Sequence, residues 1–77
     1  MNIDLAIMAL EGLGRSPLLV TVDGTAVTIS GPGSSFKELA RLCLLLGSEE
    51  TEAGEQFELN PSLHLKAESP MLKLSRD

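Results

Sequence analysis

Carboxylates are the most concentrated chemical groups in this sequence, because five glutamates fall within ten consecutive residues of a 77-residue chain. They are Glu49, Glu50, Glu52, Glu55 and Glu58. A calcium loop counted from Glu49 has Asn60 at its twelfth position, where a bidentate glutamate is required, so we predict no metal site there. No lysine or arginine lies between Arg41 and Lys66. We interpret the glutamates as a contact surface for a basic protein partner, with a merely solvated loop as the alternative.

The other side chains that could do chemistry stand alone. Cys43 has no second cysteine with which to form a disulfide, and His64 has no other histidine with which to bind zinc. We expect Cys43 to be buried in an apolar helix face and His64 to lie on the polar face of a strand. The glycine-rich loop at 31–35 lacks the lysine of a phosphate-binding loop, and its Pro32 has no amide hydrogen to donate. No positioned acid, base or nucleophile is recognisable, so we predict no enzyme, catalytic residue or cofactor.

The element with the clearest pattern is a β-hairpin over residues 18–30. Asp23-Gly24 tolerates the positive φ angles of a two-residue type I′ turn, which would place Val22 opposite Thr25 and Val20 opposite Val27. Alternation then puts five apolar side chains on one face: Leu18, Val20, Val22, Val27 and Ile29. A shift by one residue would bury threonines instead, so the apolar face is well specified.

Residues 2–14 fit a short helix. Asn2 can cap its start and Gly14 can end it. Apolar residues recur at helical spacing, namely Ile3, Ala6, Ile7, Leu10 and Leu13. The alternative is a strand, because Ile3, Leu5 and Ile7 also alternate, but the alternation fails at Met8 and we favour the helix.

A second helix is predicted from Phe36 to Leu46. Ser35 and Glu38 have the spacing of a capping box, and Gly47 occupies the position at which glycine commonly ends a helix. The apolar side chains of this helix cover an arc of about 200°, against the roughly 100° that a one-sided helix needs. They are Phe36, Leu39, Ala40, Leu42, Cys43, Leu44 and Leu46.

So wide an apolar arc needs a second neighbour besides a sheet, either the helix over residues 2–14 or a second copy of the protein. A domain of this size rarely gains more than about 3–5 kcal/mol from its core, and this one has no disulfide or metal site to add to that. We therefore expect a homodimer, with Leu42, Leu45 and Leu46 as the candidate self-association residues.

Three short alternating runs occupy the C-terminal part of the chain. Their apolar residues are Phe57 and Leu59, then Leu63 and Leu65, then Leu72 and Leu74. Pro61 and Pro70 separate the runs and belong at strand ends, because proline cannot donate to a sheet ladder. We predict an antiparallel meander over residues 56–75. The fold is then a single α+β domain of residues 1–77, with two short helices packed on one face of a small antiparallel sheet made of the hairpin and the meander.

Charge and hydropathy limit the partners. The formal net charge is −5, and the six Lys and Arg residues are scattered from Arg15 to Arg76, whereas a nucleic acid binder needs them clustered. The longest strongly apolar run, 42–46, is far shorter than the roughly 18 residues of a membrane span. Asp4 is the first charged residue, so no basic signal-peptide region begins the sequence. We expect a cytoplasmic protein that binds neither nucleic acid nor membranes.

Several segments together resemble a known family. The strand Val27-Thr28-Ile29-Ser30-Gly31 precedes a helix with Leu39-Ala40, and Leu63-His64-Leu65 precedes the closing run Ser69-Pro70-Met71-Leu72-Lys73-Leu74. Over roughly residues 20–75 this pattern is similar to that of some small immunity proteins of bacterial polymorphic-toxin systems. The resemblance implies a non-enzymatic protein that neutralises a toxin by binding it, and it transfers no individual binding residue.

Two classes of function therefore remain. The first is a protein-binding module, in the form of an immunity-type inhibitor that binds a basic toxin. The alternative is a self-associating structural or accessory protein, a homodimer without a dedicated ligand.

Overall fold

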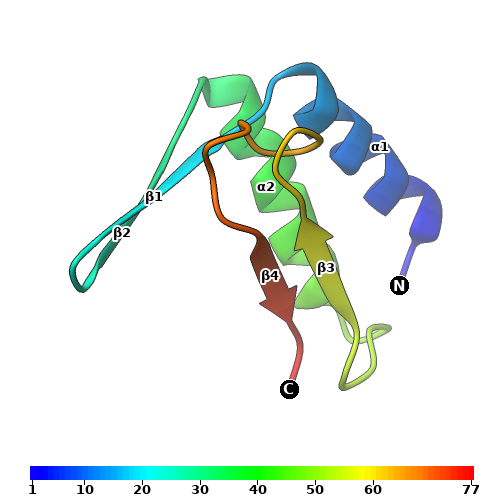
Figure 1. Ribbon diagram of the computed structural model, residues 1–77. Helices are drawn as coiled ribbons and strands as arrows, with labels where there is room; N and C mark the ends of the chain where they lie inside the picture. Colours follow the sequence, from blue (N-terminus) through cyan, green and yellow to red (C-terminus); the bar gives the residue numbers. More distant parts are fainter.

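The computed structural model describes all 77 residues and has two helices and two small antiparallel sheets, so the predicted α+β class is confirmed (Figure 1). In chain order the elements are α1 (Ile3–Arg15), β1 (Leu19–Asp23), β2 (Ala26–Ser30), α2 (Gly33–Leu46), β3 (Gln56–Leu59) and β4 (Leu72–Ser75).

The N-terminal segment is a helix, as predicted, and the alternative of a strand is excluded. The Asn2 side chain accepts a hydrogen bond from the Leu5 amide at 3.1 Å and so caps the first turn. The helix continues through Gly14 to Arg15, and the Ser16 amide then donates to the Gly12 carbonyl at 3.1 Å.

Helix α2 ends at Leu46 as predicted, but it begins earlier than predicted and without a capping box. Pro32 is its N-cap residue, and no side chain caps its amides. Ser35 instead lies buried in the first turn, where its hydroxyl donates to the Ser16 carbonyl at 2.5 Å. The capping-box prediction was wrong because a buried hydroxyl must find a partner, and the end of α1 supplies one.

The hairpin forms with the predicted apolar face but a different register. Asp23 pairs with Ala26 and Val22 with Val27, so Gly24 and Thr25 are the two loop residues. Gly24 has a φ of +60°, which fits the first loop position of a type II′ turn. The partner of each β1 residue moves by two positions, and a shift of two leaves every side chain on its predicted face.

Beyond the acidic stretch only two of the three predicted strands form. β3 and β4 pair directly, with Phe57 opposite Leu74 and Glu58 opposite Lys73. The middle run is a turn, because the amides of residues 63–65 all donate to the Asn60 carbonyl. The three-stranded meander was therefore wrong in its middle strand, and the hairpin and β3–β4 remain separate two-stranded sheets.

The core lies between the helices and the β3–β4 sheet. Helix α2 passes behind this sheet and α1 lies beside β3, whereas the far part of the hairpin projects away from the rest of the molecule (Figure 1). The buried apolar residues are Ala6, Ala9, Leu13, Leu18, Val20, Leu42, Leu46, Phe57, Leu59 and Leu65. Only the base of the hairpin contributes to them, and Val22 and Val27 near its tip are exposed.

Buried polar side chains connect the elements through backbone groups. The Ser69 hydroxyl accepts from the Val20 amide at 3.0 Å, and the Thr51 hydroxyl donates to the Leu45 carbonyl at 2.6 Å. Every buried side-chain nitrogen or oxygen has a hydrogen-bond partner. These hydroxyls therefore hold loops against strand and helix.

Neither helix has the length and apolar character needed to cross a membrane.

Candidate functional site

The five glutamates do not form one cluster. Glu49, Glu50 and Glu52 are exposed on the loop between α2 and β3. The carboxylate of Glu55 accepts a hydrogen bond from the Glu52 amide at 2.7 Å, so it is engaged in folding the loop. Glu58 lies on β3, separate from the loop glutamates.

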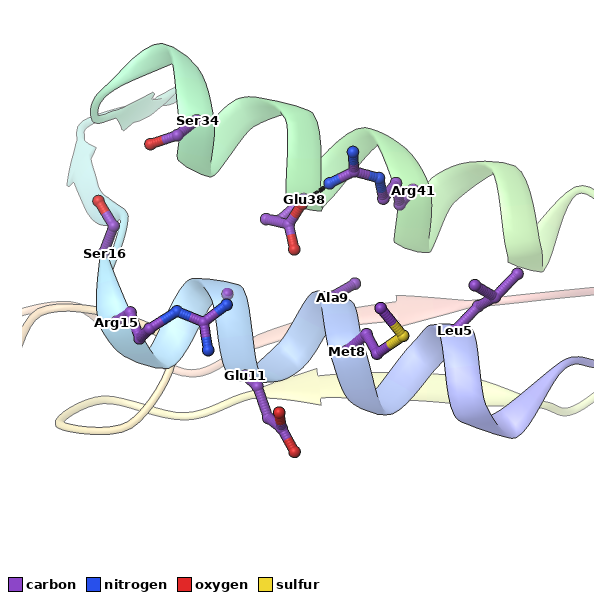
Figure 2. A pocket seen from close by; sticks show the side chains of 10 residues that line it. Leu5, Met8, Ala9, Glu11, Arg15, Ser16, Ser34, Glu38 and Arg41 are labelled. Atoms are coloured by element: carbon purple, nitrogen blue, oxygen red, sulfur yellow. Dashed lines mark ion pairs between the residues drawn. The ribbon is translucent and has the colours of Figure 1, made fainter.

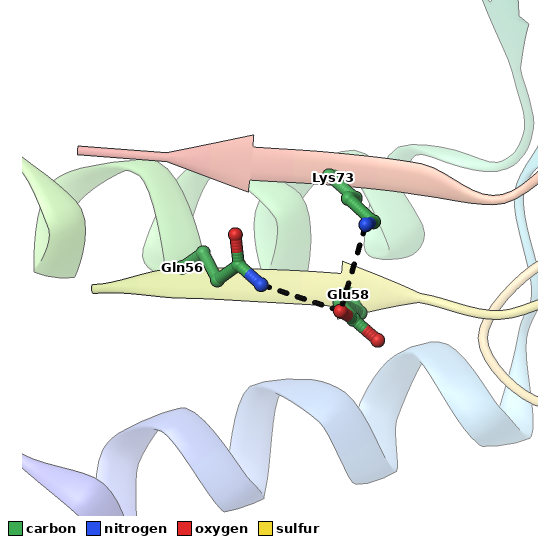
Figure 3. A network of polar contacts seen from close by, with 3 residues as sticks. All are labelled: Gln56, Glu58 and Lys73. Carbon is green, nitrogen blue, oxygen red and sulfur yellow. Dashed lines mark hydrogen bonds and ion pairs between the residues drawn. The ribbon is translucent and has the colours of Figure 1, made fainter. Parts of the chain in front are cut away.

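Glu58 belongs to the outer face of the β3–β4 sheet. Its carboxylate lies 3.9 Å from the Lys73 ammonium on β4 and accepts from the Gln56 side-chain amide at 3.3 Å (Figure 3). The charge of Glu58 is thus partly neutralised within the chain. The free carboxylates of the acidic stretch are those of the loop.

The three leucines expected at a dimer interface are not exposed on the surface of the chain. Leu42 and Leu46 belong to the core of the single chain, and Leu45 is half-buried. The α2 face that carries them is covered by other elements of the same chain, so no second copy is needed to bury it. Cys43, predicted to be buried, is exposed instead. It lies on the part of the arc left uncovered, as does Leu44, which is 75% exposed.

Large apolar side chains are exposed along α1. Ile3 is 58% exposed, Ile7 47% and Met8 62%. The buried side of this helix is made of Ala6, Ala9 and Leu13, which belong to the core together with residues of α2 and β3. The apolar residues at helical spacing are therefore divided, because Ala6 and Leu13 are buried whereas Ile3 and Ile7 are exposed. The spacing of the two alanines and Leu13, at i, i+3 and i+7, was the signal that could have identified the buried side.

A hollow of about 280 Å³ lies beside this exposed part of α1. The helix and the turn that replaces the middle strand form its walls. Its lining residues are Ile7, Leu10, Glu11, Gly14, Leu63 and His64. The sequence did not predict that Leu63 lies next to α1, because this residue was assigned to a strand.

A second and larger hollow of about 570 Å³ runs between α1 and α2 (Figure 2). It is lined by Leu5, Met8, Ala9, Glu11, Gly12, Arg15, Ser16, Ser34, Glu38 and Arg41. Glu38 and Arg41 form an ion pair within α2, and a side chain at Gly12 would collide with the Glu38 carboxylate. The lining mixes both signs of charge with hydroxyl and apolar groups, and it contains no nucleophile paired with a base.

His64 occupies the turn rather than a strand, and it is half-buried. Its Nδ1 accepts a hydrogen bond from the Asn60 amide at 3.2 Å, which requires that nitrogen to be unprotonated. Burial lowers the pKa of His64 from its ordinary value of about 6.5. The imidazole is therefore held in its neutral form, and no carboxylate hydrogen-bonds to it.

No three His, Cys, Asp or Glu side chains gather in an arrangement that could hold a metal ion. Comparison with known proteins finds no family model, no curated protein and no solved structure that matches the chain. The surface of the chain itself is therefore what indicates a function.

Proposed function

We propose that this protein is a non-enzymatic protein-binding module and that the outer side of α1 is its contact surface. The observation that carries the proposal is the exposure of Ile3 and Ile7 on consecutive turns of one short helix, with Met8 exposed next to them on the side of the α1–α2 hollow. Apolar side chains that are grouped in this way, and rimmed by polar residues, are typical of protein interaction sites.

The energetic reason is that the folded chain leaves this apolar area in water. Full burial of an isoleucine or methionine side chain contributes about 1.5–3 kcal/mol relative to full exposure. Ile7 and Met8 retain roughly half of their surface for a partner to cover. A partner that packs on α1 therefore recovers hydrophobic free energy that folding alone does not provide.

The class of partner follows from charge and from the family resemblance. The net charge of −5 and the free carboxylates of the loop glutamates favour a basic protein. An immunity-type inhibitor of a basic toxin, acting in the bacterial cytoplasm, fits both features. The role as a toxin inhibitor is supported by the family resemblance. The position of the binding surface is supported by the exposed apolar residues of α1.

The test compares variants that change only exposed residues. The tagged wild type, an Ile7→Ser/Met8→Ser variant and a matched Leu44→Ser control are used to capture partners from cells of the source organism, with quantitative mass spectrometry. We expect one protein to be enriched by the wild type and the control and to be lost with the α1 variant. Equal recovery by all three, or no enriched protein, would contradict the proposal.

Self-association is the second candidate, and a different observation favours it. Phe36, Cys43 and Leu44 are exposed on the uncovered side of α2. Two copies that pack through this side would bring their Cys43 thiols near each other. Sedimentation equilibrium decides this, because a monomer mass at high protein concentration would exclude the homodimer.

A further inference from the structure

Two carboxylates on the side of α1 that carries the smaller hollow have no ion-pair partner in the chain. Glu11 lines the hollow, and Asp4 lies two helical turns before Glu11 on the same side of α1. The two ion pairs of the chain are Arg41 with Glu38 and Lys73 with Glu58, so neither Asp4 nor Glu11 is neutralised. Figure 2 shows that Glu11 extends away from α2, whereas the Arg15 side chain lies along the α1–α2 hollow.

Apolar side chains occupy the space beside these carboxylates. Ile3 and Ile7 are one turn apart, Leu10 is partly buried, and the exposed Leu63 approaches from the turn. A hollow of about 280 Å³ is smaller than the roughly 300–1,000 Å³ of most small-molecule sites. Its size and apolar walls suit a single large side chain of a protein partner.

We propose, resting on the proposed function, that this surface binds an amphipathic helix whose apolar stripe is flanked by lysine or arginine. One apolar side chain of that helix enters the hollow between Ile7, Leu10 and Leu63, and its basic residues meet Asp4 and Glu11. The 13 residues of α1 span about 20 Å at 1.5 Å per residue, which gives a partner helix of similar length a continuous contact.

Charge complementarity selects this occupant over a second copy of the chain. A copy would present its own Asp4 and Glu11 to the same surface, and each copy carries a net charge of −5. Like charges placed opposite each other across an interface oppose association. A basic helix meets the same carboxylates favourably.

The probe is a synthetic 14-residue helical peptide with leucines along one face and lysines on both sides of them. It is added to the isotope-labelled full chain, and amide chemical shifts give the location and affinity of binding. Matched peptides carry glutamate in place of lysine, or alanine in place of leucine. We expect the lysine and leucine peptide to shift amides of α1 and of residues 60–65, and both matched peptides to bind at least about 10-fold more weakly.

Protein variants separate this surface from general attraction to an acidic protein. Asp4→Asn/Glu11→Gln should weaken peptide binding about 5-fold, and Ile7→Ser about 10-fold, since one removes charge pairs and the other an apolar anchor. Glu49→Gln/Glu52→Gln removes the same number of charges from the loop and should change affinity less than about 2-fold. Binding at the loop, equal affinity of the glutamate peptide, or no binding would overturn the inference.

The cellular experiment distinguishes failure of the inference from failure of the proposed function. If Ile7→Ser/Met8→Ser abolishes capture of the partner while Asp4→Asn/Glu11→Gln leaves it unchanged, the binding module stands and the basic-helix partner is excluded. If the unliganded wild type dimerises through α1, as judged by concentration-dependent shifts of the same amides, the occupant is a second copy and the inference is overturned.

Discussion

Single hydroxyl groups decide how the helices of this protein are joined. Ser35 is fully buried, and its hydroxyl binds both the carbonyl and the hydroxyl of Ser16 at the end of α1. Buried polar groups need such partners because water is excluded from them. The residue that looked like a helix cap in the sequence is therefore a connection between two helices.

Ser35→Ala should lower the free energy of unfolding by about 1–3 kcal/mol, because it leaves the Ser16 carbonyl without its donor in a partly buried site. Urea denaturation followed by circular dichroism measures the loss. The neighbouring Ser34 is exposed, so Ser34→Ala serves as the matched control and should change stability by less than about 0.5 kcal/mol. Equal effects of the two substitutions would show that the Ser35 hydroxyl contributes nothing.

His64 makes the free energy of unfolding depend on pH. The direction of this dependence follows from the lowered pKa of its imidazole in the folded chain. Its pKa is lowered in the folded chain, so between the folded and unfolded values the unfolded state binds more protons. The contribution of His64 to the free energy of unfolding is therefore complete well above pH 6.5. It is lost as the pH falls through 6.5 toward the pKa of the folded state. Urea midpoints measured from pH 7.5 to 5.5 should decrease for the wild type.

The matched variant for this pH dependence is His64→Gln, which cannot titrate. Its urea midpoints should stay nearly constant over the same range, because the histidine contribution is absent. A decrease of the same size in both proteins would assign the pH dependence to other groups.

At the scale of secondary-structure elements, Arg76 near the C-terminus forms hydrogen bonds to the end of α2. The Arg76 guanidinium donates to the carbonyls of Leu46 and of Ser48, the latter at 3.0 Å. The Arg76 amide also donates to the Glu55 carbonyl at 2.9 Å. A positive charge is favourable at a helix C-terminus, where carbonyl groups lack helical donors. Arg76 thus holds together α2, β4 and the start of β3.

Arg76→Gln should lower the free energy of unfolding by about 1–2 kcal/mol, since the charged hydrogen bonds to Leu46 at the end of α2 and to Ser48 are lost. Lys73→Gln is the control on the neighbouring strand β4, because its exposed ion pair with Glu58 should contribute less than about 0.5 kcal/mol. Hydrogen exchange should also show faster opening of amides near Gly54, whose amide donates to the Arg76 carbonyl. Unchanged stability and exchange in Arg76→Gln would contradict this role.

At the scale of the whole molecule, free carboxylates occur on α1 and on the loop after α2. The loop lies next to the start of α1, because the Met1 ammonium donates to the Glu50 carbonyl at 3.3 Å. Charges at the edge of an interface act mainly on the association rate, whereas buried contacts act mainly on dissociation. The loop glutamates are thus suited to attract a basic partner that then packs on α1.

Replacing Glu49, Glu50 and Glu52 by glutamine should slow association with a basic partner by about 10-fold at low salt and leave dissociation nearly unchanged. Stopped-flow kinetics or surface plasmon resonance at several salt concentrations measures both rates. The salt dependence of association should also become flatter, because screening acts beyond about 8 Å at physiological ionic strength. An association rate that responds to neither the substitutions nor the salt would identify the loop as merely solvated.

Local patterns were sufficient for the elements that local forces determine. Asn2 marked the start of α1, Gly47 followed the end of α2, and the alternation from Leu18 to Ile29 gave the correct apolar face of the hairpin. These features depend on residues close together in the sequence, whose preferences hold with little regard to the rest of the chain.

Other features of the fold depend on contacts between residues that are distant in the sequence. Which side of α1 is buried was settled by packing into the common core, which takes in the two alanines and leaves Ile7 exposed. Leu63 became part of the hollow because the Asn60 carbonyl bound the amides of a turn that the leucine alternation had predicted to be a strand. Amphipathic periodicity identifies apolar faces, but it cannot tell which of them the chain itself will cover, and the candidate binding surface lies on the part that stays uncovered.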